Sequence, residues 1–369
     1  MNLPLLENQK NLAGKKVLLR LDLNVSIKDD KVADDFRIRK ILPTLEFLHK
    51  AGARSIILSH LEGKGGDSLR PVWQELRKRF LMSFSVNFSE LAKNVGELEN
   101  GGFTLFENLR VNAGEKVNDE NFARELASFG EIFVNDAFAV SHRAHASIVG
   151  IPKFLPSFAG PLFAEEVTRL SGALKPPRPA LFILGGAKFE TKLPLLKKFI
   201  SLYDTVFVGG ALANDFLKAQ GFDVGDSLVS KTPIDLNSLI KANLHLPVDT
   251  ITSKGKKIVD AGPKTLEILR KLVAQAQFIL WNGPLGEYEI GFAAGTKNLV
   301  TIIAQSQAES VVGGGDTVAA ISALGLEDKF GFVSTGGGAM LDFLANETLP
   351  GLRALLINKE LRFSGQSAL

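Results

Sequence analysis

Basic and polar side chains follow short apolar runs throughout the first half of the chain. In KVLLRLDLNV, Arg20, Asp22 and Asn24 stand at alternate positions, so their side chains share one face of an extended segment. The other candidates stand beside turn residues: Arg37 in DDFRIRK, His60 in LSHLEG, Arg110 in FENLRVNAGE and Arg143 in SHRAHAS. Because a planar guanidinium group can bind two oxygens of a carboxylate or phosphate, converging arginines would form a site for an acidic ligand.

Simpler interpretations of these residues stay open. Asp22 and Asn24 could be no more than a hydrogen-bonded strand end, and a single arginine is more often a solvated side chain. The repeated pattern of a strand followed by a basic residue favours the ligand site. His142 and His145 flank Arg143, but two histidines without nearby Cys or further His are weak support for zinc.

Glycine-rich turns follow apolar runs in the second half. They are Gly185 and Gly186 in ILGGAK, Gly209 and Gly210 in VFVGGALAND, Gly313 to Gly315 in VVGGGDT, and Gly336 to Gly338 in VSTGGGAM. Glycine lets backbone amides approach phosphate oxygens, and the positive end of a following helix adds to the attraction. None of these turns matches the P-loop pattern GxxxxGK[ST] or the dinucleotide pattern GxGxxG, so a nucleotide would have to be held in another way.

Charged residues accompany the glycine turns. Lys188 and Lys192 in GGAKFETK are four residues apart and would share one helical face, where like charges are destabilising unless an anion lies between them. Asp316 in GGGDT offers a hard oxygen ligand suited to Mg²⁺. Without the glycines, a helix-capping role for Asp316 would be an equally good interpretation.

The segments that must position these residues alternate between two patterns. Short runs such as RSIILSH, ALFILGG and AQFILWNG are typical of buried parallel strands. Between them, segments such as ILPTLEFLHKAG and KTLEILRKLVAQ repeat apolar residues every three or four positions, as amphipathic helices do. The alternation predicts an α/β fold with doubly wound, Rossmann-like parallel sheets, whose ligands bind at the carboxyl ends of the strands.

Two domains are expected, because 369 residues exceed the size at which a single core keeps growing. The segment AEEVTRLSGALKPPRPA indicates a connecting helix followed by a proline-rich break. We therefore place an N-terminal domain at 1–162, an interdomain helix and hinge at 163–178, and a C-terminal domain at 179–351.

The composition argues against several classes of function. Lys and Arg total 43 against 40 Asp and Glu, and a net charge of +3 gives no global field for nucleic acid or a membrane surface. The absence of cysteine excludes disulfides and thiolate chemistry and fits a reducing compartment. The first residues lack the apolar core of a signal peptide, and no apolar run is long enough to span a bilayer. We expect a cytoplasmic protein without nucleic-acid or membrane partners.

Taken together and in this order, the motifs resemble the phosphoglycerate kinase family over nearly the whole chain. The strings are LRLDLNV, LSHL, ENLR, NDAF, HRAHAS, LGGAK, WNGPLG, GGGDT and STGGGA. The resemblance implies a reversible, Mg²⁺-dependent transfer of a phosphoryl group between 1,3-bisphosphoglycerate and ADP, giving 3-phosphoglycerate and ATP in glycolysis and gluconeogenesis. It also implies a monomer with hinge bending, 3-phosphoglycerate in the N-terminal domain, nucleotide in the C-terminal domain, and a tail at 352–369 that returns to the N-terminal domain.

The resemblance also assigns roles to single residues. The residues that match the family's contacts with the acidic substrate are Asp22, Asn24, Arg37, His60, Arg110 and Arg143. Those that match nucleotide contacts are Lys192, Gly262, Glu289, Gly314, Gly315, Asp316 and Thr317, with Asp316 also the magnesium ligand. The transferring phosphoryl group would be surrounded by Arg37, Lys188, Lys192 and the amides near Gly337.

One loop departs from the family pattern. HLEGKGG stands where the family typically has His-Leu-Gly-Arg-Pro, so the family's arginine position falls near Gly63. Lys64 could replace the charge but lacks the bidentate fork of arginine, which would weaken substrate binding. The loop is the best support for an alternative function, a catalytically impaired phosphoglycerate-kinase-like protein that binds a nucleotide or phosphate for regulation. A second alternative, an NAD-dependent oxidoreductase, is supported only by the predicted parallel sheets.

Overall fold

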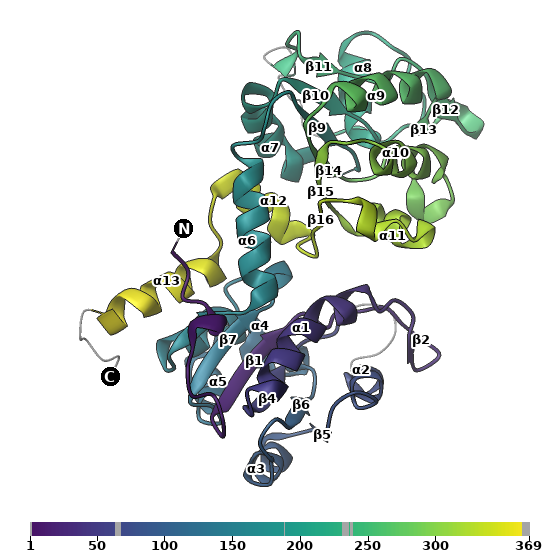
Figure 1. The fold of residues 1–369 in the computed structure, drawn as a ribbon. Helices are drawn as coiled ribbons and strands as arrows, with labels where there is room; N and C mark the ends of the chain where they lie inside the picture. Colours follow the sequence, from purple (N-terminus) through teal and green to yellow (C-terminus); the bar gives the residue numbers. More distant parts are fainter. Residues whose placement is uncertain (1, 63–67, 188, 231–235, 237–238, 364–369) are drawn as a thin grey trace. The chain divides into compact units, whose positions relative to one another are not determined.

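The computed structural model describes residues 2–62, 68–187, 189–230, 236 and 239–363 (Figure 1). The chain divides into two compact units. The N-terminal unit comprises Met1–Thr168 and Thr348–Leu369, and the C-terminal unit comprises Arg169–Glu347. Helix α6 (Pro161–Ala173) carries the chain from one unit to the other, so the interdomain segment expected at 163–178 begins inside this helix.

The N-terminal unit contains a six-stranded sheet in which all neighbouring strands are parallel. In spatial order the strands are β5 (Met82–Ser85), β6 (Phe103–Phe106), β4 (Arg54–Leu58), β1 (Lys16–Leu21), β7 (Ile132–Asp136) and β8 (Ser157–Ala159). The direction of winding reverses at β1, because the chain adds β4, β5 and β6 on one side before β7 and β8 on the other. Such a switch point leaves a crevice at the carboxyl ends of the strands, where ligands bind.

Strand β1 lies between two apolar cores. Leu18 packs into a cluster with Ile56 on one face of the sheet, and Leu19 packs with Ile57 on the other. Because both faces are covered, the strand is continuously apolar instead of alternating. One face is covered by α1 (Phe36–Lys50) and α2 (Arg70–Leu76), and the other by α3 (Phe88–Gly96) and α5 (Glu120–Ala127).

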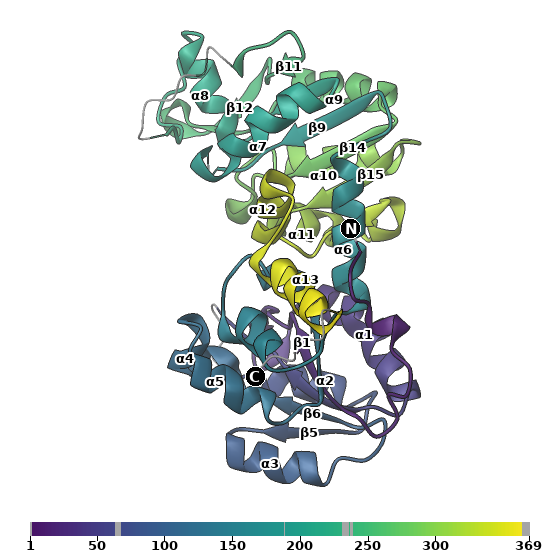
Figure 2. The same cartoon turned by 90° about the vertical axis from the view of Figure 1, so that its left-hand side faces the viewer.

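The C-terminal helix α13 (Pro350–Phe363) belongs to the N-terminal unit (Figures 1 and 2). Asn358 ties it to the edge of the sheet. Its Oδ1 accepts a 2.9 Å hydrogen bond from the amide of Ser157, and its Nδ2 donates to the carbonyls of Pro152 at 2.7 Å and Leu155 at 2.9 Å. Residues 364–369 of the expected tail lie outside the described residues.

The C-terminal unit contains a second six-stranded parallel sheet. Its strands, in spatial order, are β11 (Leu244–His245), β10 (Thr205–Val208), β9 (Ala180–Leu184), β14 (Phe278–Asn282), β15 (Glu309–Gly313) and β16 (Phe332–Val333). Numbered along the chain within this sheet, the order is 3-2-1-4-5-6, which is the Rossmann arrangement with its switch point between β9 and β14.

Helices and two small ladders complete the unit. The helices are α7 (Phe189–Leu202), α8 (Ala211–Ala219), α9 (Pro263–Gln275), α10 (Ala294–Ala304), α11 (Gly315–Leu324) and α12 (Gly338–Asn346). Strands β12 (Thr250–Thr252) and β13 (Ile258–Ala261) pair here, and β2 (Ile27–Lys28) pairs with β3 (Lys31–Val32) in the N-terminal unit. The predicted α/β class with two doubly wound parallel sheets is confirmed. Among the helices that the structure describes, none is long and apolar enough to cross a membrane.

Asp136, at the end of β7, holds the start of α6. Its carboxylate accepts hydrogen bonds from the hydroxyl of Thr44 and, at 2.8 Å, from the amide of Phe163 in the first turn of the helix. Burial raises the pKa of Asp136 to about 6, although hydrogen bonds from Thr44, Phe163 and Leu162 oppose the rise. A carboxylate at a helix N-terminus is otherwise favourable, so desolvation is the dominant effect here.

We predict that Asp136→Asn removes a pH dependence of stability. The pKa of about 6 in the folded protein exceeds the ordinary value of 3.8, so the stabilising contribution of the protonated group is complete below about pH 4 and is lost as the pH rises through 6. Asparagine does not titrate, and its Oδ1 and Nδ2 can replace both hydrogen bonds. From pH 4 to pH 7, the unfolding free energy of the wild type should fall relative to the variant by on the order of 3 kcal/mol in urea titrations. A difference between the two proteins that is constant with pH would contradict this assignment.

Candidate active site

The carboxyl edge of the N-terminal sheet brings together the residues predicted to bind an acidic ligand. Strands β6, β4, β1 and β7 are neighbours in that order. The residues that follow them are Arg110 in the short helix η2 (Leu109–Val111) after β6, His60 after β4, Asp22 and Asn24 after β1, and Arg143 after β7. Arg37 joins them from the first turn of α1. The charges of Arg110 and Arg37 both lower the pKa of His60, which places each arginine within electrostatic range of the histidine.

Asp22 and Arg37 form an ion pair across the switch point, with Arg37 Nη1 donating to the Asp22 carboxylate. Asp22 is buried, whereas 32% of the Arg37 side chain is exposed. The other carboxylate oxygen of Asp22 accepts a 3.2 Å hydrogen bond from the amide of Asn24. Asp22 therefore fixes both the turn after β1 and the orientation of Arg37, part of which stays accessible to a ligand.

His60 is a neutral hydrogen-bond donor. Burial, together with the nearby charges of Arg20 and Arg110, lowers its pKa far below the ordinary value, so the ring is uncharged at pH 7. Its Nδ1 lies 3.3 Å from Nη2 of Arg20. Because arginine can only donate, Nδ1 must accept, and the ring proton is on Nε2. His60 can thus offer an N–H to a ligand oxygen without adding charge.

A buried network behind His60 was not predicted from the sequence. The fully buried Arg20 donates from Nε to the hydroxyl of Ser147 at 2.9 Å, and that hydroxyl donates to the buried Glu115 at 2.7 Å. Glu115 also accepts from the amide of Ser147 at 3.0 Å. Burial lowers the pKa of Arg20 to about 10 although Glu115 and Asp22 oppose this, so Arg20 stays charged at neutral pH. The sequence placed Arg20 on the face of Asp22 and Asn24, but it gave no signal for Glu115.

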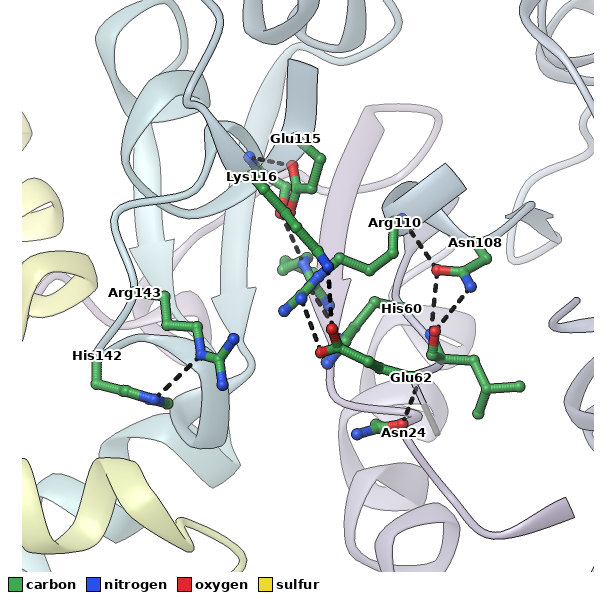
Figure 3. A network of polar contacts seen from close by, with 12 residues as sticks. Asn24, His60, Glu62, Asn108, Arg110, Glu115, Lys116, His142 and Arg143 are labelled. Atoms are coloured by element: carbon green, nitrogen blue, oxygen red, sulfur yellow. Dashed lines mark hydrogen bonds and ion pairs between the residues drawn. The ribbon is translucent and has the colours of Figure 1, made fainter. Parts of the chain in front are cut away.

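Arg110 lies beside Glu62 in the loop that departs from the family pattern (Figure 3). Its Nη1 donates to Glu62 Oε2 at 2.8 Å, and Lys116 donates to the other carboxylate oxygen at 3.0 Å. Asn108 positions the backbone next to Glu62 and that of Arg110, because its Oδ1 accepts hydrogen bonds from the amides of Leu61 at 3.1 Å and Arg110 at 3.0 Å. Among the described residues, the buried Nε of Arg110 has no hydrogen-bond partner. Glu62 and Asn108 were not predicted as site residues.

The remaining part of this edge carries Arg143 and two histidines. Arg143 is exposed and donates from Nε to His142 Nε2 at 3.3 Å. Burial and the charges of Arg110 and Arg143 lower the pKa of His145 to about 4, so it too is neutral at pH 7. Within the described part of the chain, no group of three or more His, Cys, Asp or Glu side chains could hold a metal ion. Gly63 and Lys64 lie outside the described residues.

In the C-terminal unit, Lys192 lies at the switch point between β9 and β14. The four glycine turns follow β9, β10, β15 and β16, as predicted. Lys192 is buried and donates to the carbonyl of Gly185. A Cβ atom built on Gly186 or Gly283 would lie 2.7 or 2.8 Å from Lys192 Nζ. Glycine in the turns after β9 and β14 therefore lets the ammonium group reach the sheet edge.

Glycines also begin the helices at this edge. Gly314 (φ 102°) precedes α11 and Gly337 (φ 50°) precedes α12, in backbone conformations that favour glycine. Gly315 is the first residue of α11, which begins just after β15 ends. The amides of its first turn therefore lie at the carboxyl edge of the sheet, where a helix N-terminus attracts anions. The buried Thr317 accepts a 3.1 Å hydrogen bond from the amide of Gly283, which fixes α11 to the end of β14. Its predicted contact with the nucleotide stays a prediction.

Asp316 lies close enough to Glu289 for their charges to interact. Burial and repulsion from Glu289 raise the pKa of Asp316, and Lys192 opposes the rise. Glu289 is exposed in the short helix η8 (Tyr288–Ile290). A divalent cation would relieve this repulsion, so the environment of Asp316 fits its predicted role as the magnesium ligand. The predicted contact of Glu289 with the nucleotide stays a prediction.

Gly262 lies at the turn between β13 and α9. Its amide donates to the carbonyl of Asp249 at 3.1 Å, and a Cβ here would lie 2.4 Å from the Asp249 carboxylate, so only glycine fits. The amide of Glu287 donates to Val259 of β13 at 2.9 Å, which places this turn in the same region as the loop of Glu289. Lys188 lies outside the described residues.

Comparison with known proteins shows the family of the chain. A family model described as phosphoglycerate kinase matches residues 7–347. The phosphoglycerate kinase of Leptospira biflexa is 41% identical over 98% of this chain and all of its own, and that of Dictyoglomus turgidum is 39% identical over 94% of this chain and 96% of its own. Among solved structures, the phosphoglycerate kinase of Coxiella burnetii has a TM-score of 0.81 at 37% identity, covering 97% of this chain and all of its own. That of Pyrococcus horikoshii OT3 has a TM-score of 0.84 at 31% identity, covering 96% of this chain and 99% of its own. The chain belongs to the phosphoglycerate kinase family.

Proposed function

We propose that the protein catalyses reversible phosphoryl transfer between 1,3-bisphosphoglycerate and ADP, giving 3-phosphoglycerate and ATP. The observation that carries this proposal is that each unit gathers groups suited to anions at the carboxyl edge of its sheet, and that these groups differ between the two units. The first, at the N-terminal sheet edge, is made of arginine side chains and a neutral histidine. The second, in the C-terminal unit, is made of glycine turns, helix N-termini and Lys192.

The first site suits a small ligand with a carboxylate and a phosphate. Arg37 and Arg110 would bind its oxygens through the guanidinium fork, and His60 Nε2–H would donate without repelling the arginines. The backbone amides near Gly314 and Gly337 suit the phosphates of a nucleotide instead, because they approach closely without a side chain between. We assign 3-phosphoglycerate to residues 1–162 and the nucleotide to residues 179–351.

The reaction needs charge neutralisation more than proton transfer. An oxygen of the ADP β-phosphate attacks the acyl phosphate phosphorus, the bond from phosphorus to the carboxyl oxygen breaks, and 3-phosphoglycerate leaves as a carboxylate. Both oxygens are ionised at neutral pH, so no general base is required. Arg37 and Lys192 would stabilise the charge on the loose transition state, with Lys188 and the amide of Gly337 as further proposed contacts.

Mg²⁺ would be held by Asp316, with Glu289 contributing to the local negative charge. When bound, the ion would neutralise charge on the nucleotide phosphates. Closure of the two units on their substrates, a monomeric state and a cytoplasmic location stay predictions from the sequence. The relatives compared above are named phosphoglycerate kinases, which favours an active enzyme over the catalytically impaired regulatory alternative.

The direct test is a coupled assay with 3-phosphoglycerate, ATP and Mg²⁺ that follows formation of 1,3-bisphosphoglycerate. Turnover that requires all three components and stops on addition of a chelator supports the proposal. A folded protein that binds ADP but shows no turnover would favour the regulatory alternative.

Arg37→Ala and Lys192→Ala should each lower kcat by on the order of a hundredfold, because both charges act on the transition state. The matched controls are Arg39→Ala, on the same helix as Arg37, and Lys197→Ala, on the same helix as Lys192. Both control side chains are exposed, so their removal should leave kcat within about twofold. An unchanged kcat in Arg37→Ala or Lys192→Ala would remove that residue from the mechanism.

Asp316→Asn should raise the Mg²⁺ concentration required for half-maximal activity by about tenfold or more, since one carboxylate of the proposed cation site is lost. The control is Asp328→Asn, which removes the same charge from an exposed position in the same unit. Magnesium titrations that coincide for Asp316→Asn and the wild type would exclude Asp316 as a ligand.

A further inference from the structure

Glu62 places a negative charge inside the positively charged site of the N-terminal unit. Its backbone is held on its N-terminal side, since its amide donates to Asn24 Oδ1 at 2.9 Å and the preceding residue, Leu61, is held by Asn108 through both its amide and its carbonyl. These contacts tie Glu62 to the ends of β1 and β6. Its side chain extends from this fixed point toward Arg110 and Lys116 (Figure 3).

The carboxylate occupies the groups that an acidic ligand would use. One oxygen accepts from Arg110 at 2.8 Å and the other from Lys116 at 3.0 Å, as a ligand carboxylate or phosphate would. The hydrogen bond from Lys116, with the charges of Arg110 and Arg143, keeps the pKa of Glu62 below its ordinary value, so it is an anion at neutral pH. The Arg110 side chain is only 5% exposed, which leaves few other directions from which a ligand could approach it.

Glu62 can be replaced at these two cations only by another anion. Its side chain is 47% exposed and that of Lys116 is 52% exposed, so both can be solvated when they separate, but the 5% exposed Arg110 needs a new anionic partner. An exposed ion pair contributes little to stability, whereas Arg110 would gain a new anionic partner from the ligand. Glu115, the neighbour of Lys116, is buried and bonded to Ser147, so Lys116 projects from an anchored backbone.

We propose that the Glu62 carboxylate is an internal competitor for the acidic substrate, holding Arg110 and Lys116 in the free protein and yielding them when substrate binds. Glu62 is thus a specificity-determining residue: a ligand must carry enough negative charge to replace it. This proposal rests on the function proposed above. Because the contact exists only before binding, it raises KM and the dissociation constant without acting on kcat.

The test is calorimetric titration of the full-length protein with 3-phosphoglycerate. Glu62→Gln keeps the size and the acceptor oxygen but removes the charge, and Glu62→Ala removes both. We expect each variant to bind 3-phosphoglycerate about tenfold more tightly than the wild type. KM for 3-phosphoglycerate should fall by a similar factor, with kcat unchanged. The control is Glu120→Gln, which removes one negative charge from an exposed ion pair with Arg124 in the same unit and should bind as the wild type does.

Two outcomes would overturn the proposal. Binding by both Glu62 variants that is equal to or weaker than that of the wild type would mean that Glu62 supports Arg110 and does not compete with the ligand. If no protein bound 3-phosphoglycerate, the proposed function would fail, and inorganic phosphate would then serve as the probe. Tighter binding of phosphate by the Glu62 variants would still support competition, and phosphate binding no tighter than the wild type's would refute it.

Discussion

Positive charge concentrated at one edge of a sheet is the constraint on which the N-terminal unit depends. Parallel strands bring their carboxyl ends together, so residues far apart in the chain meet there. Arg20 and Arg110 are both largely desolvated at this edge, and burial lowers the pKa of each. Charges of this kind are stable only with partners, and the fold supplies them as Glu115 behind the site, Asp22 within it and Glu62 at its rim. His60 avoids adding to the repulsion by staying neutral.

The C-terminal unit meets a similar demand by other means. Its predicted nucleotide site relies on glycine turns and helix N-termini, where backbone amides carry partial charges that need no counterion. Among the described residues that are predicted to bind the nucleotide, Lys192 is the one cation. Two glycines, Gly186 and Gly283, leave room for its ammonium group at the switch point. The two units therefore offer complementary environments, one that selects for full negative charge and one that accommodates an extended chain of phosphates.

Much of the fold and of the site could be predicted from the sequence, because the relevant signals are local. Runs such as KVLLRLDLNV and AQFILWNG became strands β1 and β14, and polar residues at the end of each run lie at the expected sheet edge. The order of the strands, which brings Arg110 near His60, follows from topology and was not predicted from the residues alone.

The sequence could not predict hydrogen bonds between residues that are far apart along the chain. Glu115 bonds Ser147 across 32 residues, and Glu62 bonds Arg110 across 48, with no spacing rule to reveal either. In the sequence, Glu62 stands out only as part of a loop that lacks an arginine. The structure shows that the same loop also introduces a carboxylate into the site, which is a different physical effect from a missing cation.

The most direct test of this account is a crystal structure of the protein with 3-phosphoglycerate bound. We expect the ligand at the carboxyl edge of β6, β4, β1 and β7, with its oxygens within hydrogen-bond distance of Arg37, Arg110 and His60 Nε2. A ligand bound away from this edge, or His60 directing Nε2 away from it, would contradict the claim that the charge arrangement of the N-terminal sheet creates the substrate site.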